Sequence, residues 1–436
     1  MEPSDVLPTL RRHVLVDGFD LVLDLDRSRG SEIVDARDGT TYLDMFSFFA
    51  SNALGMNHPN LTTDEAREAL FDAARNKPSN SDVYSEPQAA FVAAFERVLG
   101  VPDLPHLFMI EGGALGVENC LKAAFDWKSR CNEAAGRDAA LGSKVMHLRH
   151  AFHGRTGYTL SLTNTDPNKT ARFPQFDWPR IPSPGQRFPL EAHAADNAAD
   201  DDAALAAARA AFEADPYDIA CFIAEPIQAE GGDRHLSAAF LQGMQALCHE
   251  FDALFILDEV QTGVGLTGTP WAHEQLGLEP DLVAYGKKTH VCGMMGGRRL
   301  DEIDDHVWNV PSRINSTFGG SLVDMVRARI VLETIEQDAL VDNAKKLGAH
   351  LQDRLVDLAD RHAAVSNARG RGLMCAIDLP SGARRNAVAD HLLGVERVIL
   401  LGCGPQSLRF RPTLTTTQDE LDRAVDALER AVVATD

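Results

Sequence analysis

The sequence predicts an α/β protein with a mostly parallel sheet in a large domain and a smaller α+β domain. Four short segments are continuously apolar and show no period of two, which is typical of strands covered on both faces. Helical patterns separate several of these segments, and such alternation favours parallel strands. The four predicted strands are HLFMI (106–110), CFIAE (221–225), LFILDE (254–259) and DLVAY (281–285).

The residues that follow these strands are polar or rich in glycine. They read EGG, PIQAEGG, VQTG and GKK in chain order. In parallel α/β sheets, ligands bind at the carboxyl ends of the strands. The functional site is therefore predicted among these four short stretches.

The helical patterns are clearest where an N-cap residue precedes them. Ser237 precedes apolar residues at helical spacing, and Thr417 with Glu420 forms a capping box ahead of the last predicted helix. The stretch 191–215, rich in alanine and aspartate, is predicted to be a solvated loop and helix without a functional role.

The pattern of apolar and polar residues changes beyond about residue 315. From there on, longer amphipathic helices and short strands are expected. We therefore predict three segments. They are an N-terminal segment (1–60) that joins the small domain, a large cofactor-binding domain (61–314) and a C-terminal small domain (315–436).

Composition excludes several classes of partner. The 64 acidic residues outnumber the 42 basic ones, which argues against nucleic acid and anionic membranes. The first twenty residues lack both a basic start and an apolar core, and no stretch has the length of a membrane span. The seven cysteines are scattered and there is no CxxC or HExxH, so we expect reduced thiols, no metal site and a cytoplasmic protein.

The strand LFILDE resembles the Walker B strand of nucleotide-hydrolysing proteins. That interpretation requires a GxxxxGK[ST] loop, which the chain lacks. Asp258 and Lys287 at two strand ends instead suit pyridoxal 5'-phosphate, whose aldehyde reacts with a lysine amine and whose ring nitrogen needs an anionic partner. A lone lysine after glycine is more often a surface residue. However, an apolar strand end without carboxylates lowers a lysine pKa and favours the nucleophile.

Two further stretches suit the same cofactor. Gly113 and Ala114 open a predicted helix, whose free N–H groups bind anions, although Gly-Gly alone also forms turns. The loop AFHGRTG offers Phe152 and His153 as faces for a ring. Arg155 follows as a fork for a substrate carboxylate, although an isolated arginine is more often a surface residue.

These stretches, taken in order, resemble the class-III aminotransferases of pyridoxal-phosphate fold type I over almost the whole chain, and within them the lysine branch. The resemblance implies a seven-stranded sheet in the large domain. The blocks that carry it are YLDMFSFFASNALGMNHP, NKPSNSDVY, EGGALGVEN, AFHGRTGYTLSLTN, IAEPIQAEGG, FILDEVQTGVG, AYGKKTH, STFGG and SLRFRPTL.

The resemblance implies a role for each residue around the cofactor ring. Lys287 is expected to bind the cofactor covalently and to shuttle a proton, while Lys288 has a structural role. Asp258 is expected to pair with the ring nitrogen and Gln261 to lie near the phenolic oxygen. Phe152 is expected to stack on the ring.

The resemblance also implies a homodimer with a site shared between subunits. Gly113 and Ala114 are expected to bind the phosphate group from one subunit. Ser316 and Thr317 would reach that phosphate from the partner subunit, and Asn315 beside them is expected to contact substrate.

Arg409 and Glu230 are expected to act as a gate. Glu230 covers Arg409 while an amino donor reacts at its far end, and it moves away when a keto acid needs the arginine. Arg155 is expected to hold the distal carboxylate of either substrate. Glu225 either shapes the donor pocket or caps a strand. Departures from the wider family at Leu266, and at Ser321 with Leu322, are compatible with the lysine branch.

The expected reaction moves the ε-amino group of L-lysine to 2-oxoglutarate in a ping-pong cycle, giving 2-aminoadipate 6-semialdehyde and L-glutamate. An alternative donor is 4-aminobutyrate or ornithine. A second alternative is an aminomutase, against which the Glu230–Arg409 pair argues. A cofactor-sensing regulator without catalysis would need a DNA-binding module or a lost lysine, and the chain has neither feature.

Overall fold

The computed structural model describes residues 1–436 and contains the expected mostly parallel seven-stranded sheet. Each of the four predicted strands is present, with ends shifted by at most two residues. The strand order is β3 (His106–Ile110), β11 (Cys292–Gly296), β10 (Leu282–Tyr285), β9 (Leu254–Asp258), β6 (Ile219–Ala224), β4 (Lys144–Leu148) and β5 (Arg180–Ile181).

Strand β11 is the only antiparallel member of this sheet. It pairs antiparallel with β10 and β3, whereas the pairs from β10 through β9, β6 and β4 to β5 are parallel. The carboxyl ends of β6, β9 and β10 therefore meet at one edge of the sheet. Because β3 is antiparallel to β11, its carboxyl end lies at the same edge, as the site prediction requires.

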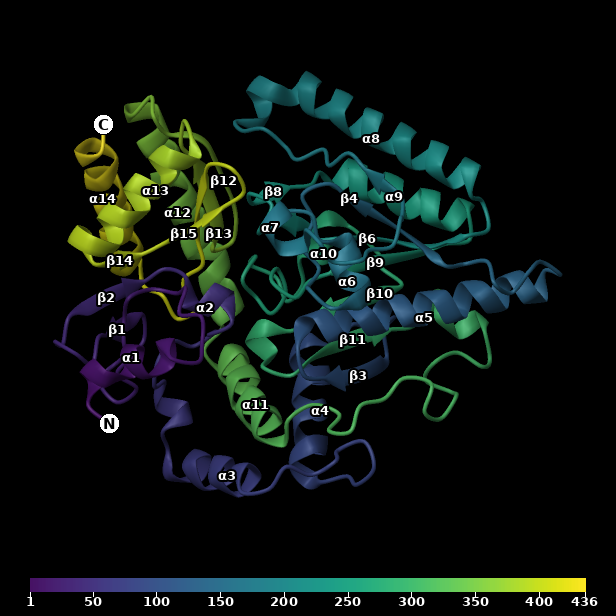
Figure 1. Ribbon diagram of the computed structural model, residues 1–436, viewed down its shortest axis with the longest axis horizontal. Coiled ribbons are helices and arrows are strands. Elements are labelled where there is room, and N and C mark those ends of the chain that lie inside the picture. Colours follow the sequence, from purple (N-terminus) through teal and green to yellow (C-terminus); the bar gives the residue numbers. More distant parts are fainter.

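Helices cover both faces of the sheet, which explains the continuous apolarity of its strands. Helix α5 (Gly113–Ala134) packs on one face, while α9 (Ala238–Glu250) covers the other with α8 (Ala194–Ala214) outside it (Figure 1). Alternate residues of β6 enter opposite cores: Cys221 packs in the core beneath α5, and Phe222 packs in the core beneath α9. Both faces of the strand are therefore excluded from solvent.

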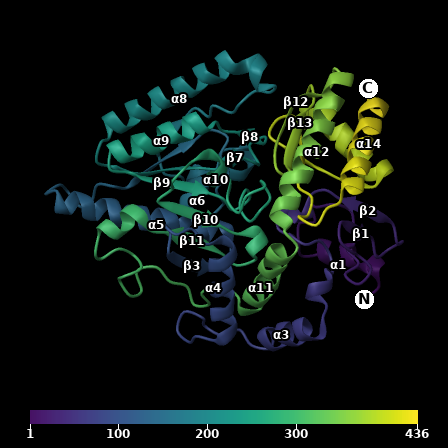
Figure 2. The same cartoon turned by 180° about the vertical axis from the view of Figure 1, so that it is seen from behind.

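A second group of strands and helices lies beside the large sheet and includes both chain ends (Figures 1 and 2). It holds a three-stranded sheet of β1 (Glu32–Val34), β2 (Thr41–Asp44) and β14 (Val398–Ile399), in which β14 from the C-terminal part pairs parallel with β2. Its four-stranded sheet has the order β12 (Ser366–Arg371), β13 (Met374–Asp378), β16 (Ser407–Phe410) and β15 (Leu401–Cys403).

The remaining helices surround and join these sheets. Helix α11 (Leu322–Gln337) packs on α4 (Glu86–Leu99) and α3 (Asp64–Ala74) and leads into α12 (Leu340–Arg361). The predicted capping box is present at Thr417 and opens the last helix. The other elements include α1 (Val6–Arg11), α2 (Ser47–Ala50), α6 (Gly157–Leu162), α7 (Pro167–Thr170), β7 (Ile227–Gln228), β8 (Arg234–His235), α10 (Ala272–Leu276), α13 (Gly382–His391) and α14 (Gln418–Ala434).

None of the helices combines the length and the apolarity that crossing a membrane requires.

Candidate active site

A cavity of about 840 Å³ opens at the carboxyl ends of β6, β9 and β10. Nine of the twelve residues that the sequence predicts for the site line this cavity, although they come from segments up to about 300 residues apart. The nine are Gly113, Ala114, Phe152, Arg155, Glu230, Asp258, Gln261, Lys287 and Arg409.

Lys287 follows β10 and begins the short 3₁₀ turn Lys287–Thr289. Burial, together with the nearby positive charges of Arg409 and Arg411, lowers its pKa to about 8. Roughly a tenth of Lys287 is therefore a neutral amine at pH 7, and this is the form that attacks an aldehyde. The low pKa agrees with the chemistry expected of a lysine at this strand end.

Lys288 does not line the cavity. Its Nζ donates to the carbonyl oxygen of Gln261 at 2.9 Å and to that of Ala50 at 3.4 Å, and the side chain is fully buried. Burial and the neighbouring charge of Lys287 lower its pKa well below the usual value. Lys288 thus links the strand-end loops to the N-terminal segment, as a structural residue does.

Asp258 ends β9 and is held by a histidine. Its Oδ2 lies 2.8 Å from Nδ1 of His153, and its Oδ1 accepts from the backbone N–H of Val260 at 3.1 Å. Both side chains are buried, and Nε2 of His153 has no hydrogen-bond partner. From the sequence alone, His153 is expected only as an aromatic face for the ring. The bond to Asp258 joins positions 105 residues apart and leaves no local signal.

Gln261 is oriented by a buried ion pair that the sequence analysis did not identify. Nε of Arg411 donates to Oε1 of Gln261 at 2.8 Å, and Nη2 of the same arginine lies 2.5 Å from Asp233. Arg411 and Asp233 are both fully buried. Because the amide oxygen of Gln261 is bound to Arg411, its NH₂ group is the part left to donate to a ligand. Arg411 stands two residues after Arg409 in SLRFRPTL, a spacing that could have indicated a shared face.

The start of α5 lines one end of the cavity with Gly113 and Ala114. Gly112 has φ +103° and turns the chain from β3 into the helix, so that the first N–H groups of α5 are free of helical partners. A Cβ at Gly113 would stand 3.0 Å from Cγ1 of Val260, and a Cβ at Gly154 would stand 2.5 Å from Cβ of Ala114. Small residues therefore keep this corner open to an anion.

Ser316, Thr317 and Asn315 do not line the cavity of their own chain. Thr317 and Asn315 are exposed, and the backbone oxygen of Ser316 accepts from Oγ of Ser81 at 2.6 Å. Their expected contribution to a partner's site stays a prediction.

Glu225 both contacts backbone and faces the cavity. Its Oε1 accepts from the N–H of Phe152 at 2.9 Å and its Oε2 accepts from the N–H of Ala229 at 3.3 Å. Burial, with the nearby charge of Asp258, raises the pKa of Glu225 well above its usual value. The capping alternative is thus present in the structure, and the same contacts fix the loop that carries Phe152.

Glu230 is bound by two cations, one on each carboxylate oxygen. Nη2 of Arg409 lies 2.9 Å from Oε2, and Nζ of Lys169 lies 2.6 Å from Oε1. Burial alone would raise the pKa of Glu230, but the two cations outweigh it and lower the pKa. Arg409 is buried, and its Nε and Nη1 have no partner. Arg155 lies at the exposed end of the cavity and forms no ion pair.

The N-terminal segment supplies a wall that the sequence analysis missed. Ser47, Phe48, Phe49 and Ala50 all have positive φ, between 40° and 63°, so α2 is a single left-handed turn. Non-glycine residues adopt this conformation at a cost, and it persists only where the surroundings hold it. The turn places the ring of Phe49 5.8 Å from Nζ of Lys287. The run FSFFAS contains no glycine that could have indicated it.

The family profile and the curated relatives that match this chain are all aminotransferases. The profile of the family described as aminotransferase class-III matches residues 16–432. The L-lysine-epsilon aminotransferase of Amycolatopsis lactamdurans is 58% identical over 99% of this chain and 96% of its own length. A probable mitochondrial 4-aminobutyrate aminotransferase of Caenorhabditis elegans is 33% identical over 94% of this chain and 87% of its own length.

The fold also matches that of a solved lysine aminotransferase. The lysine aminotransferase of M. tuberculosis, solved in the internal aldimine form, superposes with a TM-score of 0.98 at 57% identity, with 100% of both chains covered.

Proposed function

Because this chain belongs to the class-III aminotransferases, we propose that it transfers the ε-amino group of L-lysine to 2-oxoglutarate. The products are 2-aminoadipate 6-semialdehyde, which cyclises to a piperideine carboxylate, and L-glutamate. The observation that carries the choice of donor is the 58% identity to an L-lysine-epsilon aminotransferase, against 33% to a probable 4-aminobutyrate enzyme.

Pyridoxal 5'-phosphate is the cofactor of this family, and the cavity fits it. The open corner at Gly113 and Ala114 suits the phosphate, and the free NH₂ group of Gln261 suits the phenolic oxygen. Phe152 suits the ring face, and the carboxylate of Asp258 suits a protonated ring nitrogen. When bound, the cofactor supplies an aldehyde that takes up the amino group and a ring that withdraws electrons.

The protein's own residues have three tasks in the reaction. Lys287, with a pKa of about 8, accepts the proton that leaves Cε of lysine and later returns a proton to C2 of the keto acid. Asp258, held by His153, keeps its carboxylate in a fixed position in the wall of the same cavity. Phe49 and Phe152, whose rings line the cavity, shield the reacting carbon from water.

The Glu230–Arg409 pair supports the use of two unlike substrates. Lysine reacts at its far end and carries no carboxylate near the reacting carbon, so Glu230 can stay on Arg409 while Arg155 holds the distal carboxylate. The keto acid carries a carboxylate beside the reacting carbon. Nε and Nη1 of Arg409 are two buried donors without partners that can bind it once Glu230 moves.

Lys169 lowers the cost of that movement. Breaking a buried ion pair costs about 3–5 kcal/mol when it leaves a charge unpaired. Here the incoming carboxylate replaces Glu230 on Arg409, and Glu230 keeps its bond to Lys169. Both charges therefore stay compensated in either half-reaction.

We further propose a homodimer in which Ser316 and Thr317 complete the phosphate site of the partner subunit and Asn315 contacts its substrate. The exposure of Thr317 and Asn315 supports this arrangement. We also propose a cytoplasmic location, which the seven free thiols of the structure support.

The test is the isolated first half-reaction. The yellow cofactor-loaded protein is mixed separately with L-lysine, L-ornithine and 4-aminobutyrate in the absence of a keto acid. We expect rapid loss of the yellow absorbance with L-lysine only, and its return on addition of 2-oxoglutarate. Loss with another amine while L-lysine is inert would refute the proposed donor, and recovery with pyruvate but not 2-oxoglutarate would refute the acceptor.

A further inference from the structure

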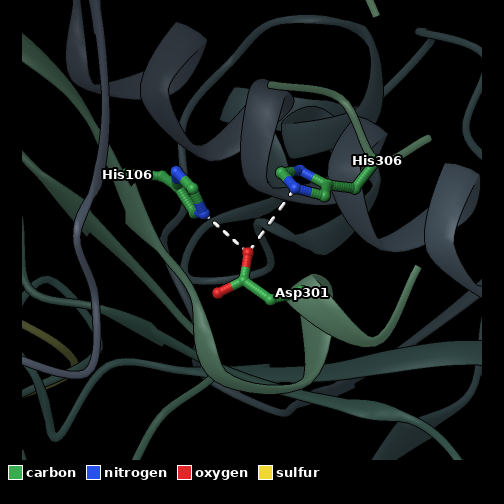
Figure 3. A group of neighbouring side chains, drawn as sticks. All are labelled: His106, Asp301 and His306. Atoms are coloured by element: carbon green, nitrogen blue, oxygen red, sulfur yellow. Dashed lines mark hydrogen bonds and ion pairs between the residues drawn. The ribbon is translucent and has the colours of Figure 1, made fainter. Parts of the chain in front are cut away.

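Two histidines and an aspartate converge at the opposite edge of the large sheet from the active site. His106 is the first residue of β3, Asp301 lies in the 3₁₀ turn Arg298–Glu302, and His306 follows in the next turn. Figure 3 shows both rings directed at one carboxylate oxygen. Nε2 of His106 is 2.6 Å from Oδ1 of Asp301, and Nε2 of His306 is 3.5 Å from the same atom. The three ligand atoms lie within 4.8 Å of one another.

The proposed reaction does not use this cluster. The cavity opens where β3 ends at Ile110 and α5 begins, whereas His106 lies at the amino end of the same strand. None of the three residues lines the cavity.

The rings are held in place by packing. The ring of Trp308 stacks on that of His106 with an interplanar angle of 25° and a centroid distance of 5.2 Å, and the centroids of the two histidines are 5.1 Å apart. His306 is only 3% exposed, while Asp301 is open to solvent. One side of the cluster is therefore rigid and the other is accessible to an ion.

The ring of His306 faces a hydrogen-bond donor at each nitrogen: Nδ2 of Asn309 lies 2.9 Å from Nε2, and the backbone N–H of Trp308 lies 3.4 Å from Nδ1. Nε2, the nitrogen nearest Asp301, therefore faces a donor and can present its lone pair to a ligand. The assignment of that amide is supported by its 2.9 Å bond to the carbonyl oxygen of Asp304, which Asn309 can keep if it releases the ring.

We propose that His106, Asp301 and His306 bind one divalent transition-metal ion, Zn²⁺ by the nature of the ligands, with water completing the coordination. Two imidazoles and one carboxylate are typical ligands of Zn²⁺, whereas Mg²⁺ and Ca²⁺ require oxygen ligands. One ion would be bound by both imidazole rings, whose Nε2 atoms otherwise face the same carboxylate oxygen of Asp301. The sequence predicts no metal site because it has no CxxC or HExxH motif, and His106 and Asp301, 195 residues apart, form no short motif.

The ion would connect β3 to the segment 297–314, which leads directly to Asn315, Ser316 and Thr317. Its role is structural: it fixes the start of the stretch that, in the proposed dimer, reaches the partner's phosphate site. The metal site itself rests only on the cluster and does not depend on the proposed function.

The test uses the cofactor-loaded protein after dialysis against a chelator. Isothermal titration with Zn²⁺ is expected to give one ion per chain, and the thermal midpoint is expected to rise with Zn²⁺ but not with Mg²⁺. The variants His106→Gln and Asp301→Asn are expected to bind at least tenfold more weakly. Both sites are accessible, so these variants test binding with less risk to folding than a change at buried His306. His13→Gln, at an exposed histidine outside the cluster, is the control and should bind as the parent does.

A crystal soaked in Zn²⁺ gives the position directly. We expect an anomalous peak at the zinc edge between the three side chains. A peak elsewhere, a stoichiometry of zero, or equal affinity in the parent and the two cluster variants would each overturn the proposal, because Zn²⁺ would then bind at other groups or not at all.

Discussion

Nζ of Lys169 lies 2.6 Å from Oε1 of Glu230, on the carboxylate oxygen that Arg409 leaves free. Nζ of Lys169 is also 5.4 Å from the ring centroid of Phe152, which lines the cavity. Glu230 is therefore shared between two cations and can turn from one to the other. This relationship makes the gate a balance between two ion pairs.

The variant Lys169→Met tests that balance. Without Lys169, Glu230 has Arg409 as its one cationic partner, so release of the arginine becomes harder. Because the side chain of Glu230 is partly exposed, we expect an effect of about 1 kcal/mol, or roughly five- to tenfold. The rate with 2-oxoglutarate should fall by that factor and the rate with L-lysine by less than about twofold, as measured by stopped-flow absorbance of each half-reaction.

Lys169→Arg is the matched control, since it keeps the charge and should restore most of the rate with 2-oxoglutarate. Equal losses in both half-reactions of Lys169→Met would show that Lys169 supports the cavity in general and does not hold Glu230.

The variant Glu230→Gln tests the other partner. It keeps the shape of the side chain but removes the charge that neutralises Arg409. We expect the half-reaction with L-lysine to slow by about tenfold or more, and the half-reaction with L-glutamate to be maintained or improved, because Arg409 is then available to a carboxylate. The ratio of kcat/KM for the two donors measures the change. An unchanged ratio would contradict the gate.

The low pKa of Lys287 predicts how uptake of the cofactor depends on pH. Burial and the charges of Arg409 and Arg411 lower this pKa from 10.5 to about 8, so the reactive neutral amine increases with pH up to that value. The rate at which the cofactor-free protein becomes yellow with added pyridoxal phosphate should rise about tenfold per pH unit below pH 8 and level off above it. A rate that continues to rise to pH 10 would indicate an ordinary lysine.

The buried pair of Arg411 and Asp233 predicts a large effect on stability. Asp233→Ala leaves the fully buried guanidinium of Arg411 without its carboxylate, which costs about 3–5 kcal/mol. Unfolding in urea should show a lower midpoint. The control Asp72→Ala breaks an exposed pair with Arg75 and should hardly change the midpoint. Equal midpoints for the two variants would refute the assigned importance of burial.

The strands and the strand-end residues could be predicted from the sequence because their causes are local. Double-sided burial leaves a continuous apolar run, and the polar residues at the end of the run, such as Asp258 and Lys287, lie at the edge of the sheet where the cavity opens. The gate residues were predicted from a family resemblance, and the ion pair between Glu230 and Arg409 is present in the structure.

What could not be predicted depends on contacts between distant segments. Arg411 and Asp233 are 178 residues apart, and no local pattern indicates which buried arginine will find which carboxylate. The left-handed turn around Phe49 is unpredictable for another reason. Its residues are poor formers of that conformation, and only the surrounding structure imposes it.

The shared site predicts that two defective chains can complement each other. Thr317→Ala removes a proposed contact to the phosphate in the partner's cavity, and Lys287→Ala removes the reactive amine from its own cavity. In a mixed dimer one cavity then carries both defects and the other carries neither. We expect each variant alone to be strongly impaired, and the mixed dimer, isolated with two different affinity tags, to recover about half of the parental activity and one tightly held cofactor per dimer. If Thr317 acted within its own chain, each cavity of the mixed dimer would keep one defect, and no recovery would be seen.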